Sequence, residues 1–419
     1  MKQVTYVEPG LLNDWHGSRA RLARFSWFLT DQFERLAMSS YRPSVARELG
    51  TLRQAGLTKM RLLCEALNVP SLHRHRALQL FETISASWGD WEILDTPSWP
   101  SDITDDGSPF EFSVALERDR FELRMLFESQ SAVPTHRSTW DAAVGFTERL
   151  GELGHADLAL FNRVKDLFTP SKFRSERFLL WHAAVLRDHT SMHKVYFNPE
   201  LEDPLHAAAR IDEALQRIQL PAARQFIQAC SQRLSPSTRI PYFSIDLAAP
   251  EVARTKIYVS AESSEHAIAI ARESGGIDPV AVAGWLELLI GDAERPGLRP
   301  LLVCTAFRRE SPVPDVTLHV PIRCYADTDA EAVNRLLPLV GPSEVALLRK
   351  AVEAVSGHAA ECTRGVLTYA SMRQGHGGLR LTSYLAPQLY TRPSDVTSGT
   401  HIVKEQSRSV STVSSNEPK

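Results

Sequence analysis

The segment 254–259 alternates charged or aromatic side chains with smaller or aliphatic ones, in the order Arg-Thr-Lys-Ile-Tyr-Val. Successive side chains of a β-strand point to opposite faces, so Arg254, Lys256 and Tyr258 would share one face of a strand. A single strand of this kind is best explained as an edge strand with a charged outer face. The recurrence of the pattern along the chain favours a different arrangement.

A basic residue precedes a tyrosine in the same way at three other places. Tyrosines stand at positions 196, 258, 325 and 384, which are separated by 62, 67 and 59 residues. The basic residues lie two or four positions earlier and are Lys194, Lys256, Arg323 and Arg380. We therefore predict a repeated unit that puts a cation and a phenol on the same strand face.

Hydrophobic periodicity divides the rest of the chain into helices and strand pairs. Apolar residues at three- and four-residue spacing predict pairs of helices, and strands joined by short turns follow each pair. The predicted strands cover 110–116, 122–127, 178–186, 194–197, 242–247, 254–260, 301–307, 316–325, 363–372 and 379–385. Short turns require antiparallel pairing. The predicted fold is α+β: a ten-stranded antiparallel β-barrel built from αββα repeats and surrounded by a ring of helices, with polar strand faces lining a lumen.

The chain of 419 residues is long for one domain, but repeat-built closed barrels can reach this length as one unit. We predict a single barrel domain over residues 1–392. Residues 1–50 mix arginine with aromatic residues at helical spacing, which indicates a helical extension that packs outside the barrel. Residues 393–419 are rich in Ser, Thr and charged residues, and we expect them to form a disordered tail.

Overall charge and cysteine content argue against nucleic-acid binding, membrane binding and a disulfide-bonded fold. The 47 basic and 50 acidic residues give a net charge of −3, which provides no overall positive field for nucleic acid or an anionic membrane. The five cysteines are scattered, odd in number and without metal-ligand spacing, as is typical of reduced thiols. The sequence has no apolar run typical of a signal peptide or a membrane span. These features predict a cytoplasmic protein without nucleic acid or membrane partners.

The predicted lumen collects basic side chains. Such cations repel one another unless an anion lies among them, and their donors suit phosphate oxygens. They are more numerous than one phosphate requires, which indicates a diphosphate. The predicted diphosphate-binding residues are Arg124, Lys194, Arg254, Lys256, Arg323 and Arg380.

The sequence pairs these cations with aromatic residues rather than with a metal motif. It has no Gly-rich phosphate loop, and the aspartates between Asp102 and Asp106 lie between Pro and Gly residues that deny them the helical spacing of a magnesium–diphosphate motif. Phenol rings have electron-rich faces that stabilise a carbocation, and their bulk excludes water. A diphosphate leaving group beside an aromatic shield indicates ionisation of an allylic diphosphate.

Glu111 is the candidate anchor for the acceptor. It stands between Phe110 and Phe112 on the first predicted strand, so it lies on the opposite face from both. On a lumen face its carboxylate could accept a hydrogen bond from an indole N–H and assist proton loss. On the other face it would be a surface carboxylate, and the pattern alone supports this reading at least as well.

Five motifs occur in the order and spacing of a known family. They are Ser108-Pro-Phe-Glu-Phe-Ser113, Lys194-Val-Tyr-Phe-Asn-Pro199, Arg254-Thr-Lys-Ile-Tyr258, Leu318-His-Val-Pro-Ile-Arg-Cys-Tyr325 and Arg380-Leu-Thr-Ser-Tyr384. Over about residues 60–392 the chain resembles the aromatic prenyltransferases of the dimethylallyltryptophan synthase type, whose barrel is called the ABBA fold. It looks closest to the bacterial members that act on tryptophan or tryptophan-derived indoles.

The resemblance implies an activity and a set of residue roles. The enzyme would transfer a dimethylallyl group from dimethylallyl diphosphate, a co-substrate, to the indole of tryptophan or a tryptophan-derived small molecule in secondary metabolism. No cofactor or metal would be required, and we expect a monomer or weak homodimer. Glu111 would hold the indole nitrogen and the six cations would bind diphosphate. The cation shield would consist of Tyr196, Tyr258, Tyr325 and Tyr384.

The proton acceptor departs from the family's pattern. Fungal tryptophan enzymes have a lysine on the strand before the Lys-x-Tyr motif, whereas this chain reads Leu180-Trp-His-Ala183 there. His182 is the candidate base because its ordinary pKa suits proton transfer, although a strand histidine is more often structural. Two other functions stay open: prenylation of a phenolic acceptor such as tyrosine or a polyketide, and binding of a diphosphate without catalysis.

Overall fold

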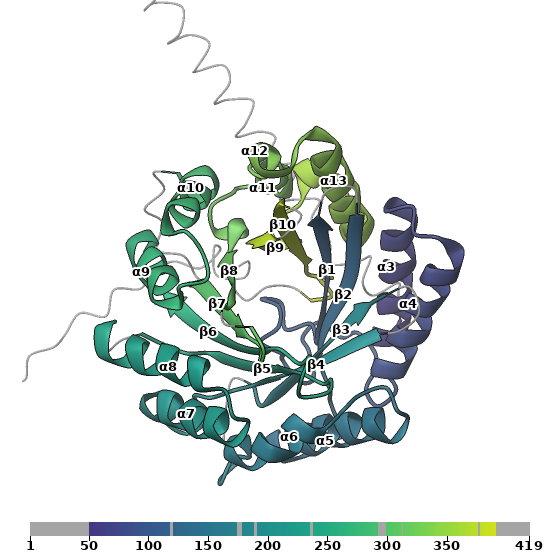
Figure 1. Ribbon diagram of the computed structural model, residues 1–419. Helices are drawn as coiled ribbons and strands as arrows, with labels where there is room; N and C mark the ends of the chain where they lie inside the picture. The colour runs from purple at the N-terminus through teal and green to yellow at the C-terminus, as the bar shows by residue number, and fades with distance from the viewer. Residues whose placement is uncertain are drawn as a thin grey trace, which may run out of the picture.

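The computed structural model describes residues 50–390, apart from 118–119, 174–177, 188–190, 235–237, 292–298, 312 and 376–377. Over these residues the strands form a closed antiparallel barrel with helices around its outside (Figure 1). The predicted fold is therefore confirmed. The predicted extension at 1–50, except for Gly50, and the predicted tail at 393–419 lie outside the described residues.

Each strand of the barrel pairs with its neighbour in the sequence, and β1 pairs with β10 to close the sheet. Short connections within each hairpin permit only antiparallel pairing, as the sequence pattern predicts. The strands are β1 (Phe110–Glu117), β2 (Arg120–Glu128), β3 (Leu180–Leu186), β4 (Ser191–Phe197), β5 (Tyr242–Asp246), β6 (Thr255–Ala261), β7 (Leu301–Phe307), β8 (Asp315–Val320), β9 (Leu367–Gly375) and β10 (Gly378–Leu385).

Helices precede each hairpin and pack against the outer wall of the barrel (Figure 1). Capping boxes at Thr51 and Thr135 fix the starts of two of them, α3 and α5. The longer helices are α3 (Leu52–Ala66), α4 (Ser71–Ile84), α5 (His136–Glu152), α7 (Ala207–Arg217), α8 (Pro221–Arg233), α9 (Ser264–Ser274), α10 (Pro279–Ile290) and α13 (Pro342–Ser356). The shorter ones are α6 (Ala159–Val164), α11 (Asp329–Asn334), α12 (Leu337–Val340) and the 3-10 helices η1 (Lys165–Phe168), η2 (Pro204–His206), η3 (Ile322–Cys324) and η4 (Ala360–Cys362).

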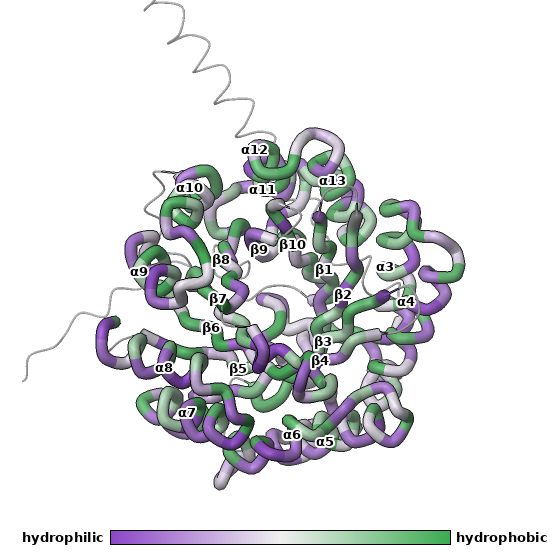
Figure 2. The backbone as a smooth tube through the Cα atoms, viewed as in Figure 1, coloured by the Kyte–Doolittle hydropathy of each residue, from purple (hydrophilic) through white to green (hydrophobic). Residues whose placement is uncertain are grey.

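The hydrophobic core lies between the barrel wall and the helices. Ile257 and Val259 of β6 are fully buried in it, as the alternation along this segment predicts. Lys256 and Tyr258 point the other way and line the lumen. Figure 2 shows the same mixture of hydrophobic and hydrophilic positions along individual strands. The two-residue period of the strands thus separates an apolar outer layer from a polar interior.

Strand β8 ends earlier than the sequence pattern predicts. The predicted strand 316–325 stops at Val320, because Pro321 has no N–H to donate to the sheet, and η3 follows. Tyr325 comes after η3 and packs into the hydrophobic core outside the barrel with Ile322. The prediction that Tyr325 belongs to the cation shield is therefore wrong.

Candidate active site

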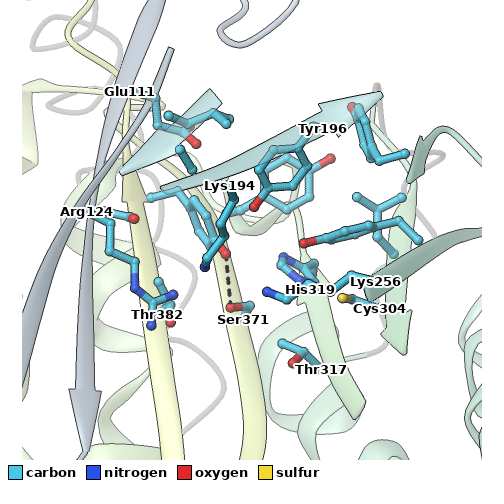
Figure 3. A pocket seen from close by; sticks show the side chains of 18 of the residues that line it. Glu111, Arg124, Lys194, Tyr196, Lys256, Cys304, Thr317, His319, Ser371 and Thr382 are labelled. Carbon is cyan, nitrogen blue, oxygen red and sulfur yellow. Dashed lines mark hydrogen bonds between the residues drawn. The ribbon is translucent and has the colours of Figure 1, made fainter. Parts of the chain in front are cut away.

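One cavity in the barrel lumen brings most of the predicted site residues together. Every predicted site residue except His182 and Tyr325 lines it, with side chains that come from both halves of the barrel. Figure 3 shows Glu111 at one end of this space and Arg124 and Lys194 farther along it. The cavity thus combines a carboxylate, several cations and several phenols.

Basic side chains gather at the end of the cavity opposite Glu111. At this end β1 finishes at Glu117, which forms an ion pair with Arg380. Carboxylates neutralise part of this charge: Glu122 accepts from Arg124 at 2.6 Å and from Arg380 at 2.8 Å. The basic residues lining this end are Arg124, Arg187, Lys194, Arg254, Lys256, Arg373 and Arg380, and the carboxylates paired with them are Glu117, Glu122, Asp246 and Asp315. Since the basic groups outnumber the acidic ones, this end can accept an anion with several negative charges.

Two lysines at this end are buried among other cations. Burial lowers the pKa of Lys194 well below its usual range, and the charge of Lys256 lowers it further. Burial, followed by the nearby Arg254, lowers the pKa of Lys256 to about 8. An anion bound between the two ammonium groups would raise both pKa values again. The electrostatics of this end therefore favour an anionic ligand.

Aromatic rings form a continuous row along the cavity wall. The ring centroid of Tyr258 lies 5.9 Å from that of Tyr196, 5.8 Å from that of Tyr242 and 5.6 Å from that of His319. The His319 ring in turn lies 5.8 Å from Tyr384. A carbocation in this space would face several electron-rich ring surfaces at once.

Sequence reasoning missed Tyr242 and His319 as members of this row. Both lie on parts of the predicted strands that the structure confirms, at positions whose neighbours, such as Phe243 and Leu318, are buried in the outer core. The alternation along each strand carries the signal that would have found them. His319 contributes the β8 ring that the sequence assigned to Tyr325.

Glu111 projects into the cavity from β1. Its side chain is buried, with the residue 5% exposed, and it accepts a hydrogen bond from Thr368 Oγ1 at 3.1 Å. Burial raises the pKa of Glu111 to about 8, although the Thr368 hydrogen bond and the charge of Arg299 act in the opposite direction. Of the two faces that the sequence left open, Glu111 therefore occupies the inner one, where it can meet a bound molecule.

Trp181 forms a flat wall of the cavity on the side of β3. Its Nε1 donates a hydrogen bond to Glu128 Oε1 at 3.3 Å, and its ring stacks on Phe178 with centroids 4.1 Å apart. Burial raises the pKa of Glu128 to about 7. The hydrogen bond and the stacking fix the plane of the indole ring against the cavity.

A charge-balanced cluster lies near Glu111. Arg299 donates to Asp105 at 2.9 Å, and Arg323 forms an ion pair with the same carboxylate. Asp102 also lines this part of the cavity. Arg323 is thus a lining residue, as predicted, but it is paired in this cluster rather than among the cations around Lys194.

His182 faces away from the lumen. It is fully buried, its Nε2 shares a 2.7 Å hydrogen bond with Thr147 Oγ1 of α5, and its ring stacks on Phe127 with centroids 5.5 Å apart. Burial, and then the neighbouring His193, lower the pKa of His182 to about 3. The alternation on β3 gives the inward position to Trp181 instead. The prediction of His182 as the catalytic base is therefore wrong.

Neither a metal cluster nor a membrane helix is found in the described part of the chain. Among these residues no group of three or more His, Cys, Asp or Glu side chains is placed to hold a metal ion. Over the same residues no helix combines the length and apolarity needed to cross a membrane. That the chemistry needs no metal stays a prediction.

Comparison with known proteins finds a matching family model and several solved structures of similar fold. A family model described as tryptophan dimethylallyltransferase matches residues 61–340, whereas no curated protein matches significantly. The 6-dimethylallyltryptophan synthase from Micromonospora olivasterospora, solved with DMASPP and Trp, is 24% identical with a TM-score of 0.72, covering 82% of this chain and 99% of that one. The 5-dimethylallyl tryptophan synthase from Streptomyces coelicolor, at 23% identity and the same TM-score of 0.72, covers 86% of this chain and 100% of that one. The prenyltransferase PriB, in a ternary complex with L-tryptophan and dimethylallyl thiolodiphosphate, is 25% identical with a TM-score of 0.71 and covers 81% of this chain and 97% of that one.

Proposed function

Because the chain belongs to the tryptophan dimethylallyltransferase family, we propose that it transfers the dimethylallyl group of dimethylallyl diphosphate to the indole ring of tryptophan or a tryptophan-derived small molecule. The observation that carries this proposal is the order of groups along one cavity. A cluster of cations, a row of aromatic rings and the buried carboxylate of Glu111 line the same space. This order matches a leaving diphosphate, an allylic cation and an indole acceptor.

The cationic end supplies the diphosphate site. Arg124, Lys194, Arg254, Lys256 and Arg380 would hold the diphosphate oxygens, with the arginines as bidentate donors and the lysines as point charges. When the bond between the allylic carbon and oxygen breaks, the leaving group keeps the electron pair, and these cations stabilise the added charge. Side chains can thus do here what a metal ion does elsewhere, so we expect that chelators leave the rate unchanged.

The aromatic row supplies the cation shield. Tyr196, Tyr258 and Tyr384 retain this predicted role, and Tyr242 and His319 join them. A cation over one such ring gains about 0.5–2 kcal/mol, depending on its desolvation. Several rings also exclude water, which would otherwise capture the allylic cation as an alcohol.

The Glu111 end supplies the acceptor site. The Glu111 carboxylate would accept the indole N–H, which directs the electron-rich ring towards the allylic cation. The nearby Asp102, Asp105, Arg299 and Arg323 offer both signs of charge. This combination suits the ammonium and carboxylate groups of an amino acid, and it favours an indole that carries them.

Incubation of the purified protein with dimethylallyl diphosphate and a panel of acceptors tests the proposal. The panel contains L-tryptophan, a cyclic dipeptide of tryptophan, tyrosine and a polyketide phenol, and products are identified by mass and NMR. We expect dimethylallylated tryptophan, with weaker or no reaction of the phenols. Product from phenols alone would refute the indole assignment, and binding of diphosphate without any product would refute the enzymatic one.

The cysteines support the predicted cytoplasmic location. All five of them lie in the described residues and are free thiols, which suits a reducing compartment such as the cytoplasm. The expected partners are the two small substrates.

A further inference from the structure

The proposed reaction needs a base, and the structure places His182, the base that the sequence predicts, outside the lumen. After the indole attacks the allylic cation, the substituted ring carbon still carries its hydrogen, and this proton must leave to restore aromaticity. The aromatic row excludes water from the place where the proton is lost. Because His182 is buried outside the barrel, it cannot take this proton, and the side chains that line the cavity offer another acceptor.

His319 is the histidine that lines the cavity within the described residues. It lies on β8 between Leu302 of β7 and Ser371 of β9, and its ring stands between those of Tyr258 and Tyr384. It is 8% exposed, and Figure 3 shows its imidazole directed into the space shared with Lys194 and Lys256. His319 is therefore placed at the level of the cation shield, between the indole anchor and the diphosphate site.

The surroundings keep the imidazole of His319 neutral. Burial, followed by the charges of Lys256 and Arg124, lowers the pKa of His319 to about 3. A ring nitrogen consequently keeps its lone pair throughout the neutral pH range. The arenium intermediate is a very strong carbon acid, so even a weak base can take its proton, provided that the base is close and unprotonated.

The other polar groups near the shield are less suited to this step. Burial raises the pKa of Tyr258, Tyr384 and Cys304, so these groups hold their own protons. Glu111 is engaged with the indole nitrogen in the proposed complex. Lys194 and Lys256 would be held as ammonium ions by the diphosphate, which raises the pKa of both.

We propose that His319 is the catalytic base, an inference that rests on the proposed function. In this step the C–H bond of the arenium carbon breaks, its electron pair returns to the indole ring, and the proton moves to a ring nitrogen of His319. The resulting imidazolium gives the proton to the departing diphosphate, which leaves the His319 side chain neutral for the next turnover.

A kinetic isotope effect tests the role directly. The substrates are L-tryptophan and L-tryptophan deuterated on the indole ring, and the variants are His319→Phe, which keeps an aromatic ring, and His319→Gln, which keeps a polar side chain. With the base removed, proton loss becomes the slow step. We expect kcat to fall about 100-fold or more in both variants, while the isotope effect on kcat rises at least two-fold above the wild-type value.

His182→Gln is the matched control, because it removes a second buried, neutral histidine of the barrel wall. We expect it to leave the isotope effect at the wild-type value. Circular dichroism and pyrophosphate binding identify any His319 variant that fails to fold, and the other variant then decides the question. A wild-type isotope effect in a folded His319 variant would overturn the assignment, since a ring that only shields the cation leaves the proton-loss step unchanged. Absence of any prenylated indole with the wild-type protein would instead overturn the proposed function and the base together.

Discussion

Glu111 and Lys256 are buried ionisable residues at different ends of one cavity, and burial moves their pKa values towards each other. The pKa of Glu111 is raised to about 8 and that of Lys256 is lowered to about 8. Near neutral pH the free enzyme thus holds Glu111 largely as the acid and Lys256 largely as the ammonium ion. Each substrate should therefore respond to pH in its own direction.

The first prediction concerns the pH dependence of the two substrates. Glu111 must lose a proton to become the stronger acceptor for the indole N–H, so kcat/KM for tryptophan should rise as the pH approaches 8. Lys256 must keep its proton to bind diphosphate, so kcat/KM for the donor should fall above pH 8. Steady-state measurements of kcat/KM for each substrate between about pH 6 and 9.5 follow both the rise and the fall. Lys256→Arg should make the fall smaller, because arginine stays charged while Lys194 still titrates. A profile that is flat for both substrates contradicts the assignment.

The second prediction concerns the carboxylate itself. Glu111→Gln keeps the shape of the side chain but removes the charge that strengthens the hydrogen bond to the indole. We expect kcat with tryptophan to fall about 100-fold or more, while the dissociation constant for pyrophosphate changes less than about three-fold. Calorimetry and product assays measure the two quantities. Wild-type turnover in this variant would remove Glu111 from the mechanism.

At the level of secondary structure elements, the alternation of side chains predicts which residues face the lumen within a strand, and it fails where the strand ends. Within β6 the alternation places Lys256 and Tyr258 in the lumen, as predicted. Beyond β8 the same reasoning fails, because Pro321 ends the strand and Arg323 and Tyr325 no longer follow a two-residue period. On β3 the alternation directs Trp181 into the lumen and His182 outward, towards α5.

Contacts between distant segments are harder to predict from the sequence. The pairing of Asp105, in the loop before β1, with Arg299 and Arg323 joins positions roughly two hundred residues apart. Neither periodicity nor spacing specifies such a contact, since it depends on how the loop folds across the end of the barrel. Sequence reasoning therefore misses the charge-balanced cluster and assigns Arg323 to the diphosphate site.

The third prediction follows from this separation of cations. Lys256→Met should weaken pyrophosphate binding about 10-fold or more, since a hydrogen bond to a charged group contributes about 1.5–3 kcal/mol. Arg323→Met should change pyrophosphate binding less than about three-fold and raise KM for tryptophan instead. Titration calorimetry on both variants compares them directly. If both variants lost the same pyrophosphate affinity, Arg323 would belong to the diphosphate site and the prediction would be wrong.

For the whole molecule, the distribution of charge matters more than its sum. The net charge of the chain is −3, yet basic residues outnumber acidic ones at one end of the lumen. Bringing these like charges together opposes folding until an anion joins them. The barrel keeps them in place through the apolar layer between its strands and the surrounding helices (Figure 1).

The fourth prediction is that pyrophosphate stabilises the folded protein. A ligand that binds only the native state at a concentration of 100 times its Kd adds about 2.7 kcal/mol to the free energy of unfolding. Thermal unfolding should therefore show a Tm that rises by a few degrees with pyrophosphate and rises less for Lys256→Met. Equal concentrations of sulfate control for general salt effects. An unchanged Tm would mean that the lumen does not bind pyrophosphate.

The most direct test is a crystal structure of the protein with dimethylallyl thiolodiphosphate and L-tryptophan bound together. The account predicts the diphosphate among Arg124, Lys194 and Lys256, the dimethylallyl group within the aromatic row, and the indole nitrogen within hydrogen-bonding distance of Glu111. Ligands bound outside the barrel, or an indole turned away from Glu111 with its ring far from the allylic carbon, would contradict it.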